Sequence, residues 1–349
     1  MSKRQKLSNV QLEDLPDEVI LKICSFMDIR EILKCAQVSK RIQAISKDES
    51  LWLKLNFYEG YVPYPFLEKA VENGCRYLSL AFAELYDWEN SKIPLNLKYL
   101  EMSRGNGLGP GLHGPHKGIL KNCHSLQKLA LPNWMLGCED INHIGENGQT
   151  LKVLNLEEIG IVFTPTELIQ RLFKRCAELN ELNFSNQNHY GSDFFTAIAD
   201  NLTPKILKVD LSNNKYLKDI HVTTLVKRCT KITELNLSYT SITNSSVNSI
   251  AKHPSLEKLD VSNTEIDSTG LLQLGTIRTL KVLKCSLKDK IIDENNLRKR
   301  LPQLSINKED LYNIATSNNI STTNYVSYED GFWEIKAEQQ ELFTEKIRI

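Results

Sequence analysis

Most of the chain carries one recurring pattern of apolar and polar residues. Apolar residues occupy positions 1, 4 and 6 of a seven-residue unit, and polar residues fill most of the positions between them. The unit recurs ten times, and its first residues are Cys75, Leu97, Leu126, Leu151, Leu179, Ile206, Ile232, Leu256, Leu280 and Leu301. Over the nine intervals from 75 to 301 the average step is about 25 residues. Because ten units share one phase, the pattern indicates an internal structural repeat.

The period and the pattern are those of leucine-rich repeats, whose units are 20–29 residues long. Positions 4 and 6 alternate along a short strand and point inward, and a returning helix, such as one over residues 223–229, supplies further apolar residues. No unit can bury its apolar side alone, so stacked neighbours complete the core. The sequence therefore predicts an α/β fold, a leucine-rich-repeat solenoid of about ten repeats over residues 75–307, with a parallel concave sheet and outer helices.

The eight cysteines do not form a recognisable metal or redox motif. They include no C-x-x-C pair, so we expect reduced thiols, no metal site and no cofactor. Three of them, Cys123, Cys176 and Cys229, stand 53 residues apart and three residues before a unit's first position. We expect each of these three to fill a buried slot at the end of a returning helix.

Positions 3, 5 and 7 of each unit should form the concave face of the sheet. Ten strands about 4.8 Å apart span roughly 43 Å, which suits a protein target better than a metabolite. These columns carry more acidic than basic residues, which favours a basic or neutral target segment. Simple solvation of the sheet is the alternative for any one of these residues. The predicted target contacts are the position-5 residues Asn155, Asn183, Asp210, Asn236 and Asp260.

Residues 12–56 have helical spacing instead and predict a separate module of three short helices. The first begins near Pro16 and places Val19, Ile20, Ile23, Phe26 and Met27 on one face. The second begins at a capping box formed by Asp28 and Glu31, and a third carries Ile42 and Ile45. So small a module with so many aliphatic residues should bury part of its apolar surface on another protein or on the repeats.

Several residues of this module resemble the F-box motif. They are Leu15, Pro16, Glu18, Ile23, Phe26, Leu33, the run 38–41 and the run 50–52. An F-box followed by leucine-rich repeats resembles the F-box/leucine-rich-repeat family of substrate receptors in cullin–RING ubiquitin ligases. Residues 274–281 and 331–336 are similar to the S-phase kinase-associated branch, which targets cell-cycle inhibitors. One departure is Ile42, where F-boxes usually have an aromatic residue.

The resemblance implies a set of partners. A small adaptor, and through it a cullin, would bind the module, and its apolar excess points to contacts at Leu15, Pro16, Ile23, Phe26 and Leu33. The inferred concave columns hold no arginine, so a phosphorylated target would need cations from convex loops or from a Cks-type accessory protein. The repeats would present a protein target for ubiquitination and proteasomal degradation.

The remaining segments are an N-terminus (1–11) expected to be flexible, a linker (57–74) and a polar, acidic tail (308–349). The tail retains Tyr325, Tyr328, Phe332 and Trp333. Aromatic residues have little reason to persist in a solvated segment, so we expect Phe332 and Trp333 to pin the tail on the repeats. In the similar receptor the tail returns along the concave face.

Composition and charge disfavour some classes of partner and location. With 43 basic and 43 acidic residues the net charge is zero, which disfavours nucleic acid as a partner. No apolar stretch could cross a membrane and no secretory signal begins the chain, so we expect a soluble cytoplasmic or nuclear protein. A non-catalytic substrate receptor is the favoured function. The alternatives are a leucine-rich-repeat scaffold acting outside ubiquitination and, without any supporting motif, an enzyme that uses scattered Ser, His and Asp residues.

Overall fold

The computed structural model of the protein describes the residues 12–57, 60–81, 83–86, 95–103, 116–161, 166–187, 189–286, 299, 302 and 304–306. Residues 1–11 and the C-terminal segment 308–349 lie outside this part of the chain, and so do the predicted tail contacts Phe332 and Trp333.

The N-terminal module contains the three predicted helices and one more. After a 3-10 turn over Leu12–Asp14 come α1 (Asp17–Cys24), α2 (Ile29–Ala36), α3 (Lys40–Ile45) and the single turn α4 (Glu49–Trp52). The predicted capping box is confirmed, because the backbone N–H of Glu31 donates to Asp28 Oδ1 over 3.0 Å, and that of Asp28 donates to Glu31 Oε2 over 3.2 Å.

One parallel sheet of eleven strands runs through the rest of the described chain, in the order of the sequence. Its strands are β1 (Lys54–Asn56), β3 (Tyr77–Ser79), β5 (Tyr99–Glu101), β6 (Lys128–Ala130), β8 (Val153–Asn155), β10 (Glu181–Asn183), β11 (Lys208–Asp210), β12 (Glu234–Asn236), β13 (Lys258–Asp260), β14 (Val282–Lys284) and β15 (Ser305–Ile306). Each of the ten predicted units supplies one strand. The eleventh, β1, lies within the range predicted for the N-terminal module, so the sheet begins one strand earlier than the repeat pattern.

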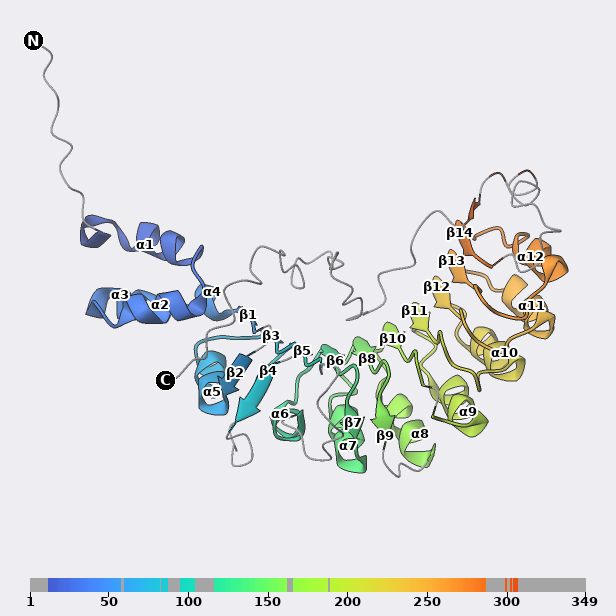
Figure 1. The fold of residues 1–349 in the computed structure, drawn as a ribbon, viewed down its shortest axis with the longest axis horizontal. Coiled ribbons are helices and arrows are strands. Elements are labelled where there is room, and N and C mark those ends of the chain that lie inside the picture. The colour runs from blue at the N-terminus through green and yellow to red at the C-terminus, as the bar shows by residue number, and fades with distance from the viewer. Residues whose placement is uncertain are drawn as a thin grey trace, which may run out of the picture.

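Helices line the outer side of this curved sheet, and the N-terminal module projects from one end (Figure 1). The outer helices are α5 (Tyr64–Glu72), α6 (His116–Asn122), α7 (Cys138–Glu146), α8 (Thr166–Arg175), α9 (Ser192–Asn201), α10 (Asp219–Arg228), α11 (Asn244–Ala251) and α12 (Ser268–Leu274). Two small parallel sheets pair β2 (Gly60–Pro63) with β4 (Ala83–Tyr86), and β7 (Met135–Leu136) with β9 (Gly160–Ile161). The predicted solenoid is confirmed.

The core of the repeats is one continuous cluster that extends from Trp52 to Ile306. The predicted cysteine slots are confirmed, since Cys123, Cys176 and Cys229 are each 0% exposed. Burial raises the pKa of the Cys176 thiol to about 12 and that of the Cys229 thiol to about 11. Both thiols therefore stay protonated at neutral pH and serve as small apolar side chains.

A left-handed residue follows the strand in six units. Asn133, Glu158, Asn186, Asn213, Tyr239 and Asn263 have φ values between 51° and 63°. Asparagine tolerates this conformation better than other non-glycine residues, which explains its recurrence there. The turn directs the backbone N–H of Asn213 to the carbonyl of Ser238 in the next unit, at 2.8 Å. The same turn therefore links successive repeats.

The module and the solenoid share a packed junction. Trp52 of α4 is 1% exposed, belongs to the core of the repeats and donates its indole N–H to the carbonyl of Ser46 over 2.6 Å. Its ring lies 6.2 Å from that of Phe66 in α5. At Gly74, φ is +109° and an added Cβ would lie 2.3 Å from Glu49 Cγ, so only glycine fits this junction.

Candidate protein-binding surfaces

Apolar side chains remain exposed on the first helix of the N-terminal module. Val19, Ile23 and Phe26 are spaced four and three residues apart, so they lie on one side of α1 and of the turn after it. Their exposed fractions are 41%, 39% and 79%, and Val38, between α2 and α3, is 83% exposed. Lys22 Nζ lies 4.9 Å from the centre of the Phe26 ring. We call Val19, Ile23 and Phe26 the apolar face.

The structure divides the apolar residues of the first helix into two stripes. Ile20 and Cys24 are buried with Ile32 in a small core of the module, whereas Val19, Ile23 and Phe26 point to solvent. The predicted face of Val19, Ile20, Ile23, Phe26 and Met27 is therefore only partly buried, because α1 packs its Ile20 side inward and leaves its Val19 side exposed.

The five predicted adaptor contacts lie in different surroundings. Pro16, Ile23 and Phe26 are exposed, and Leu15 is half-buried against the small core of the module. Leu33 is half-buried and packs against the core of the repeats. Val19 and Val38 were not among the predicted contacts. The spacing of Val19 from Ile23 was the available signal for the first of them.

Arg41 of α3 holds the beginning of the module in place. Its Nη2 donates to the carbonyl of Leu15 over 2.7 Å, and its Nε donates to Asp17 Oδ1 over 2.7 Å. The arginine and aspartate side chains are 40% and 64% exposed, so the pair contributes little as a surface salt bridge. Its geometric effect is to position the segment that carries Pro16 beside α3.

The side chains of the position-5 row stabilise the turns that follow the strands. The side-chain Oδ1 of each residue accepts a hydrogen bond from the backbone N–H two residues later, over 2.8–3.1 Å, in Asn155, Asn183, Asp210, Asn236 and Asp260. Four of the five are at most 9% exposed, and Asn236 is half-buried. The expectation of an exposed row is thus corrected, because turn formation occupies these side chains. Target binding by them stays a prediction.

The acidic excess expected on the concave face is largely hidden. Glu157, Asp210, Glu234 and Asp260 are all less than a tenth exposed. Burial raises the pKa of Asp210, and it raises the pKa of Glu101 to about 7. A count of acidic residues in the sequence therefore overstates the negative charge that a target would meet, and it gives no support to a basic target segment.

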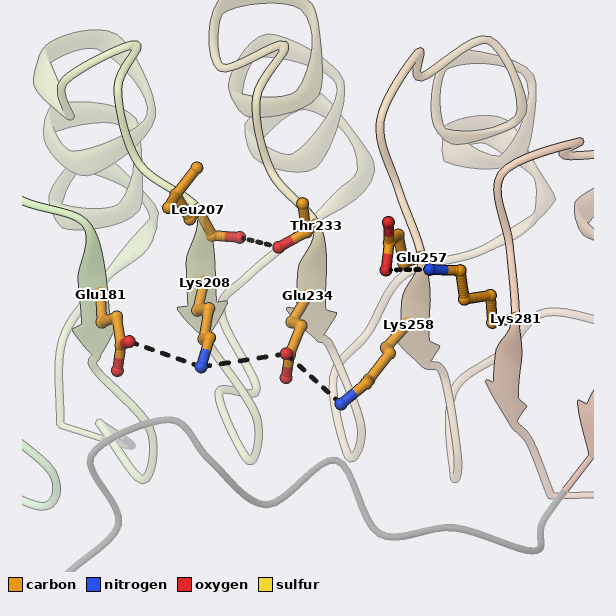
Figure 2. Close-up of polar contacts among 8 residues, drawn as sticks. All are labelled: Glu181, Leu207, Lys208, Thr233, Glu234, Glu257, Lys258 and Lys281. Carbon is orange, nitrogen blue, oxygen red and sulfur yellow. Dashed lines mark hydrogen bonds and ion pairs between the residues drawn. The ribbon is translucent and has the colours of Figure 1, made fainter. Parts of the chain in front are cut away.

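Position 3 forms a row of alternating charges on the C-terminal half of the sheet (Figure 2). Lys208 Nζ lies 3.4 Å from Glu181 Oε1 and 3.9 Å from Glu234 Oε1, and Lys258 Nζ lies 3.4 Å from the same oxygen of Glu234. At position 2, beside this row, Lys281 Nζ lies 2.7 Å from Glu257 Oε2. Each charged side chain lies near one of opposite charge on the neighbouring strand, so the charges of this row neutralise one another.

One serine–histidine pair in the described part of the chain has the distance of a catalytic pair. Ser192 Oγ lies 3.0 Å from His221 Nε2, but His221 Nδ1 accepts a hydrogen bond from the backbone N–H of Lys218 over 2.9 Å. This contact places the ring proton on Nε2, which then donates to the serine and cannot take its proton. Burial lowers the pKa of His221, so the ring stays neutral. The pair caps α10.

Among the described residues, no group of three His, Cys, Asp or Glu side chains could hold a metal ion. The described helices are all too short or too polar to span a membrane.

Two family descriptions match the chain. Residues 66–340 match the description "SKP2 LRR domain", which covers more than half of the chain. Residues 12–58 match the description "F-box-like". The two matches cover the solenoid and the N-terminal module respectively.

Individual relatives match a short stretch. F-box/WD repeat-containing protein 8 of Homo sapiens is 43% identical over 49 residues, which are 14% of this chain and 8% of that protein. The protein of the same name from Rattus norvegicus is 42% identical over 50 residues, again 14% and 8% of the two chains. The chain therefore spans less than a tenth of the length of these curated relatives.

The solved structures that match this chain share little sequence identity with it. Human 5T4, a trophoblast glycoprotein, is 15% identical, with a TM-score of 0.46 over 66% of this chain and 88% of that one. Internalin C2 of Listeria monocytogenes is 20% identical, with a TM-score of 0.37 over 55% and 71% of the two chains.

Proposed function

Because the chain belongs to the F-box/leucine-rich-repeat family with an SKP2-type repeat domain, we propose that it is the substrate-recognition subunit of an SCF-type (cullin–RING) ubiquitin ligase. Receptor families of this kind are generally non-catalytic. The N-terminal module binds a small adaptor, the adaptor binds a cullin, and the repeats present a protein target to the catalytic subunits. The ubiquitinated target is then degraded by the proteasome.

The apolar face carries this proposal. Three large apolar side chains, Val19, Ile23 and Phe26, share one side of α1 and remain exposed, while the neighbouring stripe is buried. Apolar surface gains about 25 cal/mol per Å² when it leaves water, so such a face favours a partner. Arg41 fixes the adjoining Leu15–Asp17 segment, so a partner would meet an ordered surface.

The junction supports the part of the proposal that concerns presentation. Trp52 belongs to the core of the repeats, and Ile29, Leu33 and Leu51 pack against that same core. The module is therefore held against the solenoid by side-chain packing. A target bound on the repeats would stay at a set distance from the adaptor, as ubiquitin transfer from a separate subunit requires.

Further parts of the proposal rest on the resemblance of the sequence. Cell-cycle regulators are the proposed target class, and a Cks-type accessory protein is a proposed partner. We also propose that Phe332 and Trp333 hold the tail on the repeats. The eight free cysteines, six of which are buried, fit a protein that acts in the cytoplasm or the nucleus, which are reducing compartments.

Affinity purification followed by mass spectrometry tests the proposal. The tagged full chain should bring down an F-box-binding adaptor and a cullin. A Val19→Ser/Phe26→Ser variant should lose both partners and keep its fold, because both side chains are exposed. A matched Tyr216→Ser/Ile220→Ser variant alters exposed apolar residues of the repeats and should keep both partners.

Two outcomes would contradict the proposal. If the wild-type chain recovers neither adaptor nor cullin, the protein acts as a scaffold outside ubiquitination. If the Val19→Ser/Phe26→Ser variant recovers both as well as the wild type does, the apolar face is not the adaptor site.

A further inference from the structure

Three exposed apolar side chains belong to two neighbouring repeats at one edge of the solenoid. Tyr216 lies in the loop from β11 to α10, Ile220 lies in the first turn of α10, and Tyr239 lies in the loop from β12 to α11 (Figure 1). Their exposed fractions are 39%, 66% and 60%. Among the described residues of the repeats, Leu207 is the only other exposed large apolar side chain, and it precedes β11 at the opposite edge. We call Tyr216, Ile220 and Tyr239 the loop patch.

Hydrogen bonds between the two loops hold the loop patch in place. Ser241 Oγ donates to the carbonyl of Lys215 over 2.9 Å. The backbone N–H of Thr243 donates to Asp219 Oδ1 over 2.8 Å, and Thr243 Oγ1 donates to Asp219 Oδ2 over 2.9 Å. Each of these two acceptor residues immediately precedes a residue of the loop patch. A partner would therefore meet a surface that is already ordered, which lowers the entropic cost of binding.

The backbone of Tyr239 has a conformation that a tyrosine rarely adopts. Its φ is 56°, and of the other five non-glycine residues with positive φ in the repeats, four are asparagine and one is glutamate. The turn uses only the backbone of this residue, because the N–H of Tyr239 donates to the carbonyl of Ser262 over 2.8 Å, as that of Asn213 does to Ser238. A bulky residue in this region is an outlier that points to a use outside the turn itself.

The side chains of the preceding repeats are used within the array, in contrast to that of Tyr239. Asn213 Nδ2 donates to Asn186 Oδ1, and Asn186 Nδ2 donates to Glu157 Oε1 over 3.0 Å. A tyrosine has no amide group with which to extend this series. The loop from β10 to α9 also holds a tyrosine, Tyr190, but its ring stacks on Phe194 and its hydroxyl donates to a backbone carbonyl over 3.0 Å.

The size of the loop patch favours a short segment as its occupant. Two tyrosines and an isoleucine exposed to these extents present about 300 Å² of surface, which is in the range of functional patches on monomeric proteins. A stable interface between folded proteins buries roughly 800 Å² on each partner. The loop patch is thus too small to hold a second copy of this chain on its own.

The chemistry of the loop patch favours a proline-rich segment. None of its three side chains carries a charge, and each tyrosine combines an apolar ring with a hydroxyl group. A segment in the polyproline II conformation makes no internal hydrogen bonds, so its carbonyl groups can accept from such hydroxyls while its proline rings pack on the aromatic rings. This conformation also loses little entropy on binding.

We propose that the loop patch binds a short proline-rich segment of a target protein in the polyproline II conformation. Proline rings of the segment pack on Tyr216 and Tyr239, the two hydroxyls donate to its carbonyl groups, and Ile220 extends the apolar surface. This inference deepens the proposed function and rests on it for the statement that the segment belongs to a target.

Fluorescence anisotropy of the full-length chain with a labelled nine-residue peptide of repeating Ala-Pro-Pro tests the inference. The wild-type chain should bind this peptide and should not bind a matched peptide of repeating Ala-Ser-Ser. Tyr239→Asn should bind the peptide at least about tenfold more weakly, and its melting temperature should be unchanged or higher, because asparagine tolerates positive φ. The control Leu207→Ser removes an exposed apolar side chain at the opposite edge and should bind as the wild type does.

Acetylation of tyrosines by N-acetylimidazole, followed by mass spectrometry, tests the other possible occupants. In the free full-length chain, Tyr216 and Tyr239 should react at every protein concentration, and the Ala-Pro-Pro peptide should slow both reactions. Protection that grows with protein concentration would mean that a second copy covers the loop patch. Protection at all concentrations without peptide would mean that another segment of the same chain covers it. Either result would overturn the inference.

Three results of the binding experiment would also overturn it: no binding of the Ala-Pro-Pro peptide by the wild-type chain, equal binding of the Ala-Ser-Ser peptide, or equal weakening in Tyr239→Asn and Leu207→Ser. Failure of the proposed function gives a different result. Tyr239→Asn should still bring down the adaptor and the cullin. If the wild-type chain binds the Ala-Pro-Pro peptide but neither of these partners, the proposed function fails and the loop patch stands as a site for proline-rich segments.

Discussion

The N-terminal module and the repeats bury their apolar residues to very different extents. The module has a core of its own made of Ile20, Cys24 and Ile32, and it leaves Val19, Ile23 and Phe26 in solvent. In the repeats, one cluster extends from Trp52 to Ile306, and each unit covers the apolar side of its neighbour. Stacked repeats bury the apolar surface of one another, whereas a short helical module leaves one apolar face exposed to solvent. This uncovered face is the one that we propose for the adaptor.

Polar side chains of the repeats are likewise used within the array. The Oδ1 atoms of Asn183 and Asp210 accept hydrogen bonds from the backbone N–H groups of their own turns, so these atoms are less available to a partner. The lysines and glutamates of position 3 in the C-terminal half of the sheet neutralise each other.

The largest expected effect lies in the core of the repeats. Leu182→Ala removes a side chain that is 0% exposed in β10, and we expect a loss of about 3 kcal/mol in the free energy of unfolding. Val19→Ala shortens an exposed side chain of α1 and should change that free energy by less than about 0.5 kcal/mol. Urea denaturation measures both. Equal changes in the free energy of unfolding would contradict the contrast in apolar burial between the two regions.

A pH-dependent effect is expected at Glu101. Its folded pKa is about 7 against an ordinary 4.5, so the folded chain keeps a proton that the unfolded chain releases between these values. The stability that Glu101 contributes at low pH is therefore lost as pH rises from about 4.5 to about 7. Glu101→Gln should stabilise the protein at pH 8 by on the order of 2 kcal/mol and leave it nearly unchanged at pH 4.

Thermal unfolding of the wild type and of Glu101→Gln at both pH values provides the measurement. A destabilised Glu101→Gln at pH 8 would mean that the ionised carboxylate is favoured in the folded chain, against the expected sign.

A substitution at position 5 should lower the stability of the fold, whether or not it affects target binding. Asn183→Ala leaves the backbone N–H of Ser185 without its acceptor and removes the contact to Glu157 Oε2, so we expect a loss of about 1–2 kcal/mol. Differential scanning calorimetry measures the change in melting temperature. If Asn183→Ala melts as the wild type does but loses a target, the side chain is a binding residue, as the sequence suggested.

The smallest effect is expected in the alternating row. Lys258→Gln removes one ion pair with Glu234, but Lys208 remains close to the same carboxylate. The loss should be below about 1 kcal/mol, which is typical of cross-strand charge pairs. Chemical denaturation at low and at high salt checks it. A larger loss would show that the row is needed to align the repeats.

The repeats could be predicted from the sequence far better than the surfaces. Leucines at fixed spacing determine the strands, since only one arrangement buries all of them, and Asp28 with Glu31 marks the start of α2. The repeat pattern misses β1 because Leu55 and Phe57 follow the helical module without a preceding unit. Its pairing with β3 depends on the neighbouring strand.

Exposure could not be predicted from the sequence because it depends on tertiary contacts. Asn155 and Lys98 are both polar residues near a strand, yet the first closes a buried turn and the second is exposed. Leu33 and Phe26 are both apolar residues of the module, but only Leu33 packs against the repeats. A count of acidic residues likewise takes no account of the burial of Asp210 and Glu234.

Calorimetric titration of the full-length chain with its F-box-binding adaptor tests the central claim most directly. Phe26 and Ile220 are 79% and 66% exposed, one on the module and one on the repeats, so Phe26→Ala and Ile220→Ala form a matched pair. Phe26→Ala should weaken adaptor binding by about thirtyfold or more, and Ile220→Ala should leave it unchanged. Unchanged affinity in Phe26→Ala, or equal weakening in both variants, would contradict the assignment of the apolar face as the adaptor site.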